Sequence, residues 1–176
     1  MEFSELVKIR RSCRAYKEAQ VLEDDIRQII ETALMAASWK NSETARYYVA
    51  LSDDAIAEVF DGLPDFNKNS TKNAAYIVET YKKGLSGYGA PGQQADEVGE
   101  GWGAYDLGIA TAYLMLKAKE LGYDTLIMGL KNNDRLRAYF EIPEDEIIMP
   151  VIAIGKAAGE NILRPRKTVD EVLNIK

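Results

Sequence analysis

The sequence contains no histidine and only one cysteine among its 176 residues. Without histidine, Ser-His-Asp and Cys-His nucleophilic sites, HExxH zinc peptidases and His-ligated haem are excluded. With Cys13 alone, a disulfide within the chain, a CxxC redox pair and a multi-cysteine zinc site are excluded as well. Any catalysis by this protein must therefore use other chemistry.

Long hydrophobic runs are also missing. The chain begins MEFSELVKIRR, with acids at once and no apolar run of signal-peptide length, and its longest apolar stretch is interrupted well short of a membrane span. A reducing compartment suits a chain with one cysteine. We therefore expect a cytoplasmic protein without a membrane partner.

Over the whole chain, basic residues are fewer than acidic ones. There are 28 acids against 22 lysines and arginines, and the formal net charge is -6. A globally acidic protein does not favour a nucleic-acid partner. The chain is 47% hydrophobic, which is enough to bury a core of its own, and we expect residues 1–176 to form a single domain.

Hydrophobic periodicity predicts an α+β domain. An acidic first turn and a stripe of apolar residues at helical spacing predict a helix over 23–37. Lesser helices are predicted over 3–8, 53–60 and 133–140. β-Branched and aromatic runs predict four strands, at 47–51, 76–80, 125–130 and 150–155.

The most apolar helix is predicted from Trp102 to Gly122, with Gly122 as its C-cap. Because its middle is apolar nearly all round, this helix should be buried on several sides, inside the domain or across a subunit interface. The preceding residues 84–103 hold seven of the 13 glycines and are expected to form a surface loop, with a lid as one interpretation.

Within that loop, GYGAPG at 87–92 fits the dinucleotide pattern GxGxxG. Pro91 interrupts the motif, no apolar helical stripe follows it, and no strand ends in an acid about 20 residues later. A flexible loop is therefore the favoured interpretation.

Cations gather in two places. Residues 8–17, KIRRSCRAYK, carry five cations and no acid, and residues 162–167, ILRPRK, carry three more and no acid. If the fold brings these two basic patches together they would form a phosphate site, because arginine forks match phosphate oxygens. Two unrelated solvated charge runs are the alternative.

Two further features have ordinary and functional interpretations. Ser38, Trp39 and Asn41 crowd into one helix-to-strand loop, where they would cap the helix or hydrogen-bond a planar ligand; capping is favoured. Cys13 is more readily a small buried residue than a nucleophile, since no histidine is present to activate it.

Taken in order, these segments resemble the FMN-dependent nitroreductase family, of which the chain would be a short member. RRSCRAY at 10–16 is similar to the family's opening RRSxRxF, and AASWKNSE at 36–43 to its PSxxNxQPW. WGAYDLGIATAYLML resembles its central helix, LGYDTLIMGL its flavin strand, and PVIAIGKA with RPR its last strand and basic tail. The resemblance implies a mostly antiparallel central sheet flanked by helices, a long buried central helix, and a dimer.

The resemblance also implies an FMN site. Both basic patches would meet at the phosphate and ribityl chain, through Arg10, Arg11, Ser12, Arg164 and Arg166. Arg14 would lie near the pyrimidine ring, where a cation stabilises the charge gained on reduction. Asn67 or Asn69 matches a pyrimidine-ring ligand. Backbone amides at Met128 and Gly129 match those near flavin N5 and O4, and Ser38, Trp39 and Asn41 match residues supplied by the other subunit of a homodimer.

The sequence departs from the family pattern in one segment. Ala37 replaces the family proline, and Glu43-Thr44-Ala45 replaces QPW. The implied function is an FMN-dependent oxidoreductase that passes hydride from NADH or NADPH through flavin N5 to a small electron acceptor such as a nitroaromatic or a quinone, without a metal. A non-catalytic dimer that stores or senses FMN or another phosphorylated metabolite is the alternative, and reductive dehalogenation or flavin cleavage is a rival within enzymes.

Overall fold

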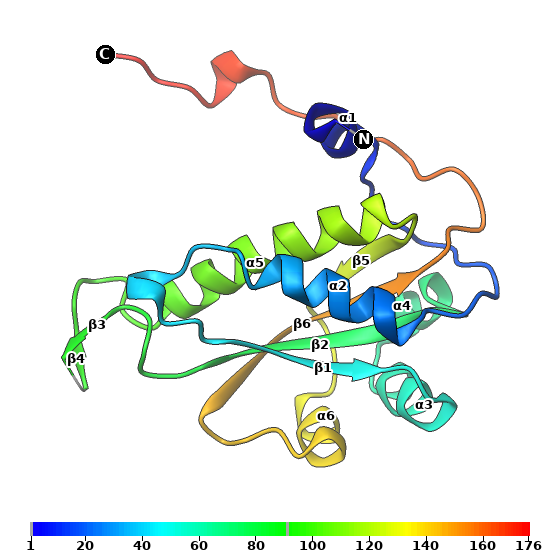
Figure 1. The fold of residues 1–176 in the computed structure, drawn as a ribbon, viewed down its shortest axis with the longest axis horizontal. Coiled ribbons are helices and arrows are strands. Elements are labelled where there is room, and N and C mark those ends of the chain that lie inside the picture. The colour runs from blue at the N-terminus through cyan, green and yellow to red at the C-terminus, as the bar shows by residue number, and fades with distance from the viewer. Residues whose placement is uncertain (1, 91) are drawn as a thin grey trace.

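The protein is an α+β fold built on one antiparallel sheet, as seen in a computed structural model that describes residues 2–90 and 92–176. Strand order is β1-β2-β6-β5, with every neighbouring pair antiparallel (Figure 1). The strands span Ala45–Ala50 (β1), Ala75–Lys82 (β2), Asp124–Met128 (β5) and Glu146–Gly155 (β6). The four predicted strands and the antiparallel sheet are thus confirmed.

Two layers of helices cover the sheet. Alternating side chains of β2 face opposite layers, because successive residues of a strand point to opposite faces. Ile77 packs under α2 (Glu23–Ala33) and α5 (Gly101–Glu120), and Val78 faces the layer of α3 (Asp53–Asp61) and α6 (Asn133–Phe140). Both core clusters share this one sheet, and we infer a single domain.

The remaining elements lie at the ends and edges of the sheet. They are α1 (Phe3–Ile9), the 3-10 turn η1 (Trp39–Asn41), α4 (Asp65–Ser70), the small hairpin β3 (Tyr88–Ala90) and β4 (Gln93–Gln94), and η2 (Val169–Glu171). Figure 1 shows the tail that follows β6 passing α1 and running away from the sheet. Among the described residues, no helix has the length and apolar character that a membrane span requires.

Two local predictions need correction. The helix expected over 23–37 ends at Ala33, because the next side chains, Leu34 and Met35, point to solvent and gain no core contact. The loop 84–103 holds the β3–β4 hairpin and the first turns of α5, so it is more regular than expected. Pro91, which interrupts the GxGxxG pattern, lies outside the described residues. The C-cap of α5 is Leu121, and the predicted C-cap Gly122 follows it with a left-handed φ of 79°, which suits a glycine that ends the helix.

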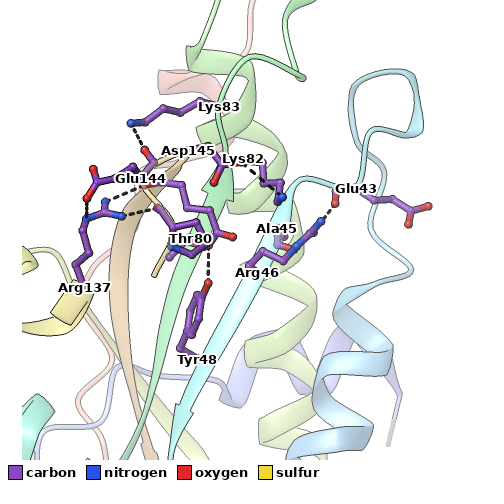
Figure 2. Close-up of polar contacts among 12 residues, drawn as sticks. Glu43, Ala45, Arg46, Tyr48, Thr80, Lys82, Lys83, Arg137, Glu144 and Asp145 are labelled. Atoms are coloured by element: carbon purple, nitrogen blue, oxygen red, sulfur yellow. Dashed lines mark hydrogen bonds and ion pairs between the residues drawn. The ribbon is translucent and has the colours of Figure 1, made fainter. Parts of the chain in front are cut away.

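The end of the sheet away from β5 is tied by polar side chains (Figure 2). Tyr48 on β1 and Thr80 on β2 both donate to the buried carboxylate of Glu146 on β6. Arg137 of α6 donates to the carbonyl oxygens of Ile142, Pro143 and Glu146. These bonds satisfy buried polar groups and fix the three strands relative to α6.

Candidate functional site

The first basic patch lies along the open edge of β5. Ser12 forms a parallel bridge with Thr125, and the N–H of Cys13 donates to the Thr125 carbonyl at 2.9 Å. Cys13 and Tyr16 point into the core, so the side chains of Ser12 and Arg14 point outward. The strand edge thus presents a hydroxyl and a guanidinium to solvent.

The second basic patch starts beside the first. The N–H of Ala158 donates to the Ala15 carbonyl at 2.9 Å, which joins the start of the tail to the first segment. Asp124, buried at the start of β5, accepts from Asn161 at 3.1 Å and from Lys119 at 2.8 Å. These contacts hold the tail so that Arg164 lines a hollow of about 180 Å³ together with Ser12 and Arg14.

Arginines converge here without acidic partners. Burial lowers the pKa of Arg10, and the nearby charges of Arg166 and Arg11 lower it further. Among residues 2–90 and 92–176, no ion pair involves Arg10, Arg11, Arg14, Arg164 or Arg166. Glu160 also lines the hollow, but these arginines form no ion pair in the described part of the chain. A cluster of like charges without ion-pair partners is suited to a bound anion such as a phosphate.

A second hollow adjoins the first and shares Arg14 with it. It has a volume of about 510 Å³, within the range of small-molecule sites. Exposed apolar side chains form much of its wall, from Phe66, Ile127 and Leu130. Because Arg14 lines both hollows, the two together would suit a long ligand with an anionic end and a planar apolar end.

Asn67 and Gly129 occupy the second hollow in ways that suit a ligand. Asn67 is 7% exposed and its amide donates to the Leu130 carbonyl at 3.5 Å, whereas Asn69 is exposed and does not line the hollow. The Met128 side chain lies in the core, so only its backbone faces the hollow. A Cβ built at Gly129 would meet nothing within 4 Å, and the chain therefore leaves this space open beside the strand end.

Ser38, Trp39 and Asn41 lie elsewhere in the same chain. Figure 1 shows η1 at the N-terminal end of α5, whereas residues 10–16 and the start of the tail lie at its C-terminal end. Asp106 contacts η1 and Lys119 contacts the β5 edge, and 13 residues of helix between them span about 20 Å. Within one chain the fold therefore brings nine of the predicted site residues together, whereas Ser38, Trp39 and Asn41 lie apart from them.

The side chain of Glu43, where the sequence departs from the family pattern, faces solvent. The Glu43 side chain accepts from the Asn41 amide at 2.7 Å, and its backbone carbonyl accepts from Arg46 at 2.9 Å (Figure 2). In its own chain Glu43 lines neither hollow. The acid at this position thus does not obstruct the site formed by residues 10–16.

Cys13 has no features of a nucleophile. Its side chain is fully buried, burial raises the pKa of the thiol, and the thiol donates to the Ala15 carbonyl at 3.2 Å. The interpretation of Cys13 as a small core residue agrees with this geometry. Among the described residues there is also no group of three or more acidic or cysteine side chains that could hold a metal ion.

The sequence analysis singled out none of the four acids that are buried among the described residues, Glu79, Asp106, Asp124 and Glu146, and two of them interrupt apolar runs. Glu79 lies in the middle of β2 and Asp106 in the first half of α5, and both face the space between the sheet and the helices. Each is a single acid inside an otherwise apolar run, YIVET and WGAYDLGIATAY. That isolation is the signal that would have identified them, because carboxylates are rarely buried without a structural or functional reason.

Comparisons with known proteins point to one family. The family model described as "Nitroreductase family" matches residues 7–156. An NADPH-dependent oxidoreductase of Staphylococcus aureus strain USA300 is 25% identical over 182 residues, covering 96% of this chain and 71% of that protein.

Solved structures share the fold over the whole chain. A protein of Exiguobacterium sibiricum 255-15, crystallised in complex with FMN, has a TM-score of 0.85 at 23% identity and covers 100% of this chain and 98% of that chain. A nitroreductase family protein of Streptococcus pneumoniae TIGR4 has a TM-score of 0.84 at 19% identity, with 99% and 100% covered. On the family match, which spans most of its length, this chain belongs to the nitroreductase family.

Proposed function

We propose that this protein is an FMN-dependent oxidoreductase that takes hydride from NADH or NADPH and reduces a small acceptor such as a nitroaromatic or a quinone. The observation that carries the proposal is the pair of adjoining hollows, one lined by unpaired arginines and the other by apolar side chains and the open backbone at Gly129. Bound FMN supplies the redox chemistry, since its ring accepts hydride and donates electrons. The family match and the relative described as an NADPH-dependent oxidoreductase support the same class.

The chain's own residues would bind and orient the cofactor. Arg10, Arg11, Ser12, Arg164 and Arg166 would hold its phosphate and ribityl chain. Arg14, which lines both hollows, would lie near the pyrimidine ring and stabilise the negative charge that the ring gains on reduction. Asn67 would bind the same ring, and the backbone amides of Met128 and Gly129 would face its N5 and O4 edge. Phe66, Ile127 and Leu130 would limit the access of water to that edge.

The proposal includes a homodimer with two shared sites. In one chain α5 exposes a stripe of aromatic and small residues, Tyr105, Gly108, Ala112 and Tyr113. The tail exposes six large apolar side chains, at Ile162, Leu163, Val169, Val172, Leu173 and Ile175. Unpartnered apolar surface of this extent is typical of subunit interfaces. In such a dimer Ser38, Trp39 and Asn41 would reach the flavin of the other subunit.

We also propose a cytoplasmic location, because a reducing compartment suits a chain whose one cysteine is free and buried. Its partners would be a second copy of the chain and the small acceptor. The overall charge of -6 gives no reason to add a nucleic acid.

Anaerobic mixing with a reductant tests the proposed function. We expect the flavin absorption band of the FMN-loaded protein to bleach rapidly with NADH or NADPH. A dimer that only stores or senses FMN would bind the flavin and show no fast bleaching with either nucleotide. That second result, obtained with fully FMN-loaded protein, would contradict the proposed oxidoreductase and favour a dimer that stores or senses FMN.

A further inference from the structure

The buried acid of the central helix holds two loops. Asp106 on α5 is 6% exposed, and one of its oxygens, Oδ2, accepts two hydrogen bonds. The backbone N–H of Trp39 donates to it at 2.9 Å and the hydroxyl of Ser86 at 2.6 Å. Trp39 begins η1, and Ser86 lies in the glycine-rich loop 84–103, so a single carboxylate joins both segments to the helix.

A second polar contact joins the same loops directly. The hydroxyls of Ser42 and Ser86 lie 2.8 Å apart. Because Ser86 donates its proton to Asp106, Ser42 is the donor in this pair. Asp106, Ser86 and Ser42 therefore form a chain of hydrogen bonds from the helix, through the glycine-rich loop, to the end of η1.

The turn held in this way has an unfavourable backbone. Lys40, Asn41 and Glu43 have φ values of 49°, 56° and 48°, in the left-handed region that residues with a Cβ disfavour. Such conformations persist when the surroundings determine them, and they cluster at ligand-binding segments. Asp106 is the buried group that fixes the first N–H of this turn.

Two tryptophans report where the two loops lie. The rings of Trp39 and Trp102 are 5.0 Å apart between centroids and inclined by 47°. The indole of Trp39 donates to the Tyr88 carbonyl at 3.4 Å, and that of Trp102 donates to Asp96 in the glycine-rich loop. The position of Trp39 thus depends on the same loop that Asp106 holds through Ser86.

We propose that Asp106 is a positioning residue that couples the glycine-rich loop 84–103 to η1 and so fixes Ser38, Trp39 and Asn41 for binding the flavin of the other subunit. The anchoring of the loops stands on the contacts above. The consequence for flavin binding rests on the proposed function and its dimer. Asp106 itself touches neither of the two hollows formed by its own chain.

Circular dichroism reads out the anchoring without any flavin. The chain has two tryptophans, and they form this tilted pair, so an exciton signal from indoles reports on this pair alone. In Asp106→Ala we expect this signal to fall by at least about half. In the same variant the dissociation constant for FMN should rise about tenfold, as expected when hydrogen bonds to a carboxylate are lost.

Three matched variants separate positioning from a general loss of structure. Asp106→Asn keeps the size and one accepting oxygen, and should restore most of the signal and of the FMN affinity. Ser86→Ala removes one of the two donors to Asp106 and leaves the Trp39 N–H in place, so the carboxylate keeps a partner. This variant should give an intermediate loss of the exciton signal and of the FMN affinity. Glu120→Gln changes the exposed acid at the far end of the same helix and should equal the parent protein.

Each outcome decides part of the inference. An unchanged exciton signal in both Asp106→Ala and Ser86→Ala would overturn the anchoring. A lost signal with unchanged FMN affinity would overturn the coupling to the flavin. If the parent protein binds no FMN, the proposed function fails and the coupling fails with it, while the exciton signal still decides whether Asp106 holds the loops.

Discussion

Replacing Arg164 by Ala is expected to raise the dissociation constant for FMN by about 10- to 100-fold. Arg164 lines the hollow that also contains Ser12 and Arg14, and it enters no ion pair among the described residues. Its guanidinium is therefore free to donate to a phosphate, and a hydrogen bond to a charged group contributes about 1.5 to 3 kcal/mol. Titration of protein-bound FMN fluorescence at fixed ionic strength measures the change.

A neighbouring cation provides the control for this effect. Lys167 lies three residues further along the same exposed tail and does not line the hollow. Lys167→Ala removes the same charge, so a loss of long-range attraction alone would weaken FMN binding equally in both variants. A larger loss in Arg164→Ala supports a direct contact, whereas equal affinities in the two variants would remove the tail from the site.

Replacing Glu79 by Gln is expected to raise the free energy of unfolding above that of the parent protein, and to do so by about 3 kcal/mol more near neutral pH than at acid pH. Burial raises the pKa of Glu79 from 4.5 to about 7, and the hydrogen bond from Thr111 at 2.7 Å partly opposes that rise. Its second oxygen and the hydroxyl of Tyr47, directly opposite on β1, have no partner within the described part of the chain. A glutamine amide would be neutral at every pH and would offer Tyr47 a donor.

The sign follows from proton binding. Between pH 4.5 and about 7 the native state holds a proton on Glu79 that the unfolded chain has lost, so the free energy of unfolding falls as the pH rises through this window. Below it both states are protonated, and above about 7 the full penalty of the buried charge is present. A rise in the pKa of Glu79 from 4.5 to about 7 corresponds to a loss of about 3 kcal/mol in the free energy of unfolding.

Urea unfolding at about pH 4.5 and about pH 8 measures this difference, with equal chain concentration and flavin loading for each variant. Glu31→Gln, at an exposed position on α2, provides the control and should follow the parent protein at both pH values. If the stability difference between Glu79→Gln and the parent is the same at both pH values, Glu79 does not titrate as a buried acid.

The sequence predicts the sheet well because its strands carry strong local signals. Runs such as Tyr76–Thr80 and Pro150–Gly155 are rich in β-branched or aromatic residues, and the central strands are buried on both faces. Helix α4 was missed because its sequence, DFNKNS, has low helix propensity and no apolar stripe. It forms in tertiary context, where Asn67 is buried and accepts from Thr71 through its carbonyl.

The candidate site was predictable only in part from the residues themselves. Two basic patches at opposite ends of the chain were visible, but their meeting depends on the bridge between Ser12 and Thr125 and on the contact between Ala158 and Ala15, which are long-range pairings. The resemblance to the nitroreductase family supplied that step. The role of Asp106 depends on three segments meeting in space, and no local pattern contains that information.

We propose that donor and acceptor use one flavin site in turn; this is the central claim of the proposed function, and steady-state kinetics test it most directly. Initial rates should be measured against a quinone at several fixed concentrations of NADH or NADPH. If the donor leaves before the acceptor binds, the double-reciprocal plots are parallel, which is the result we predict. Intersecting lines would show that both substrates bind at the same time, and would contradict the account even if the flavin itself were confirmed.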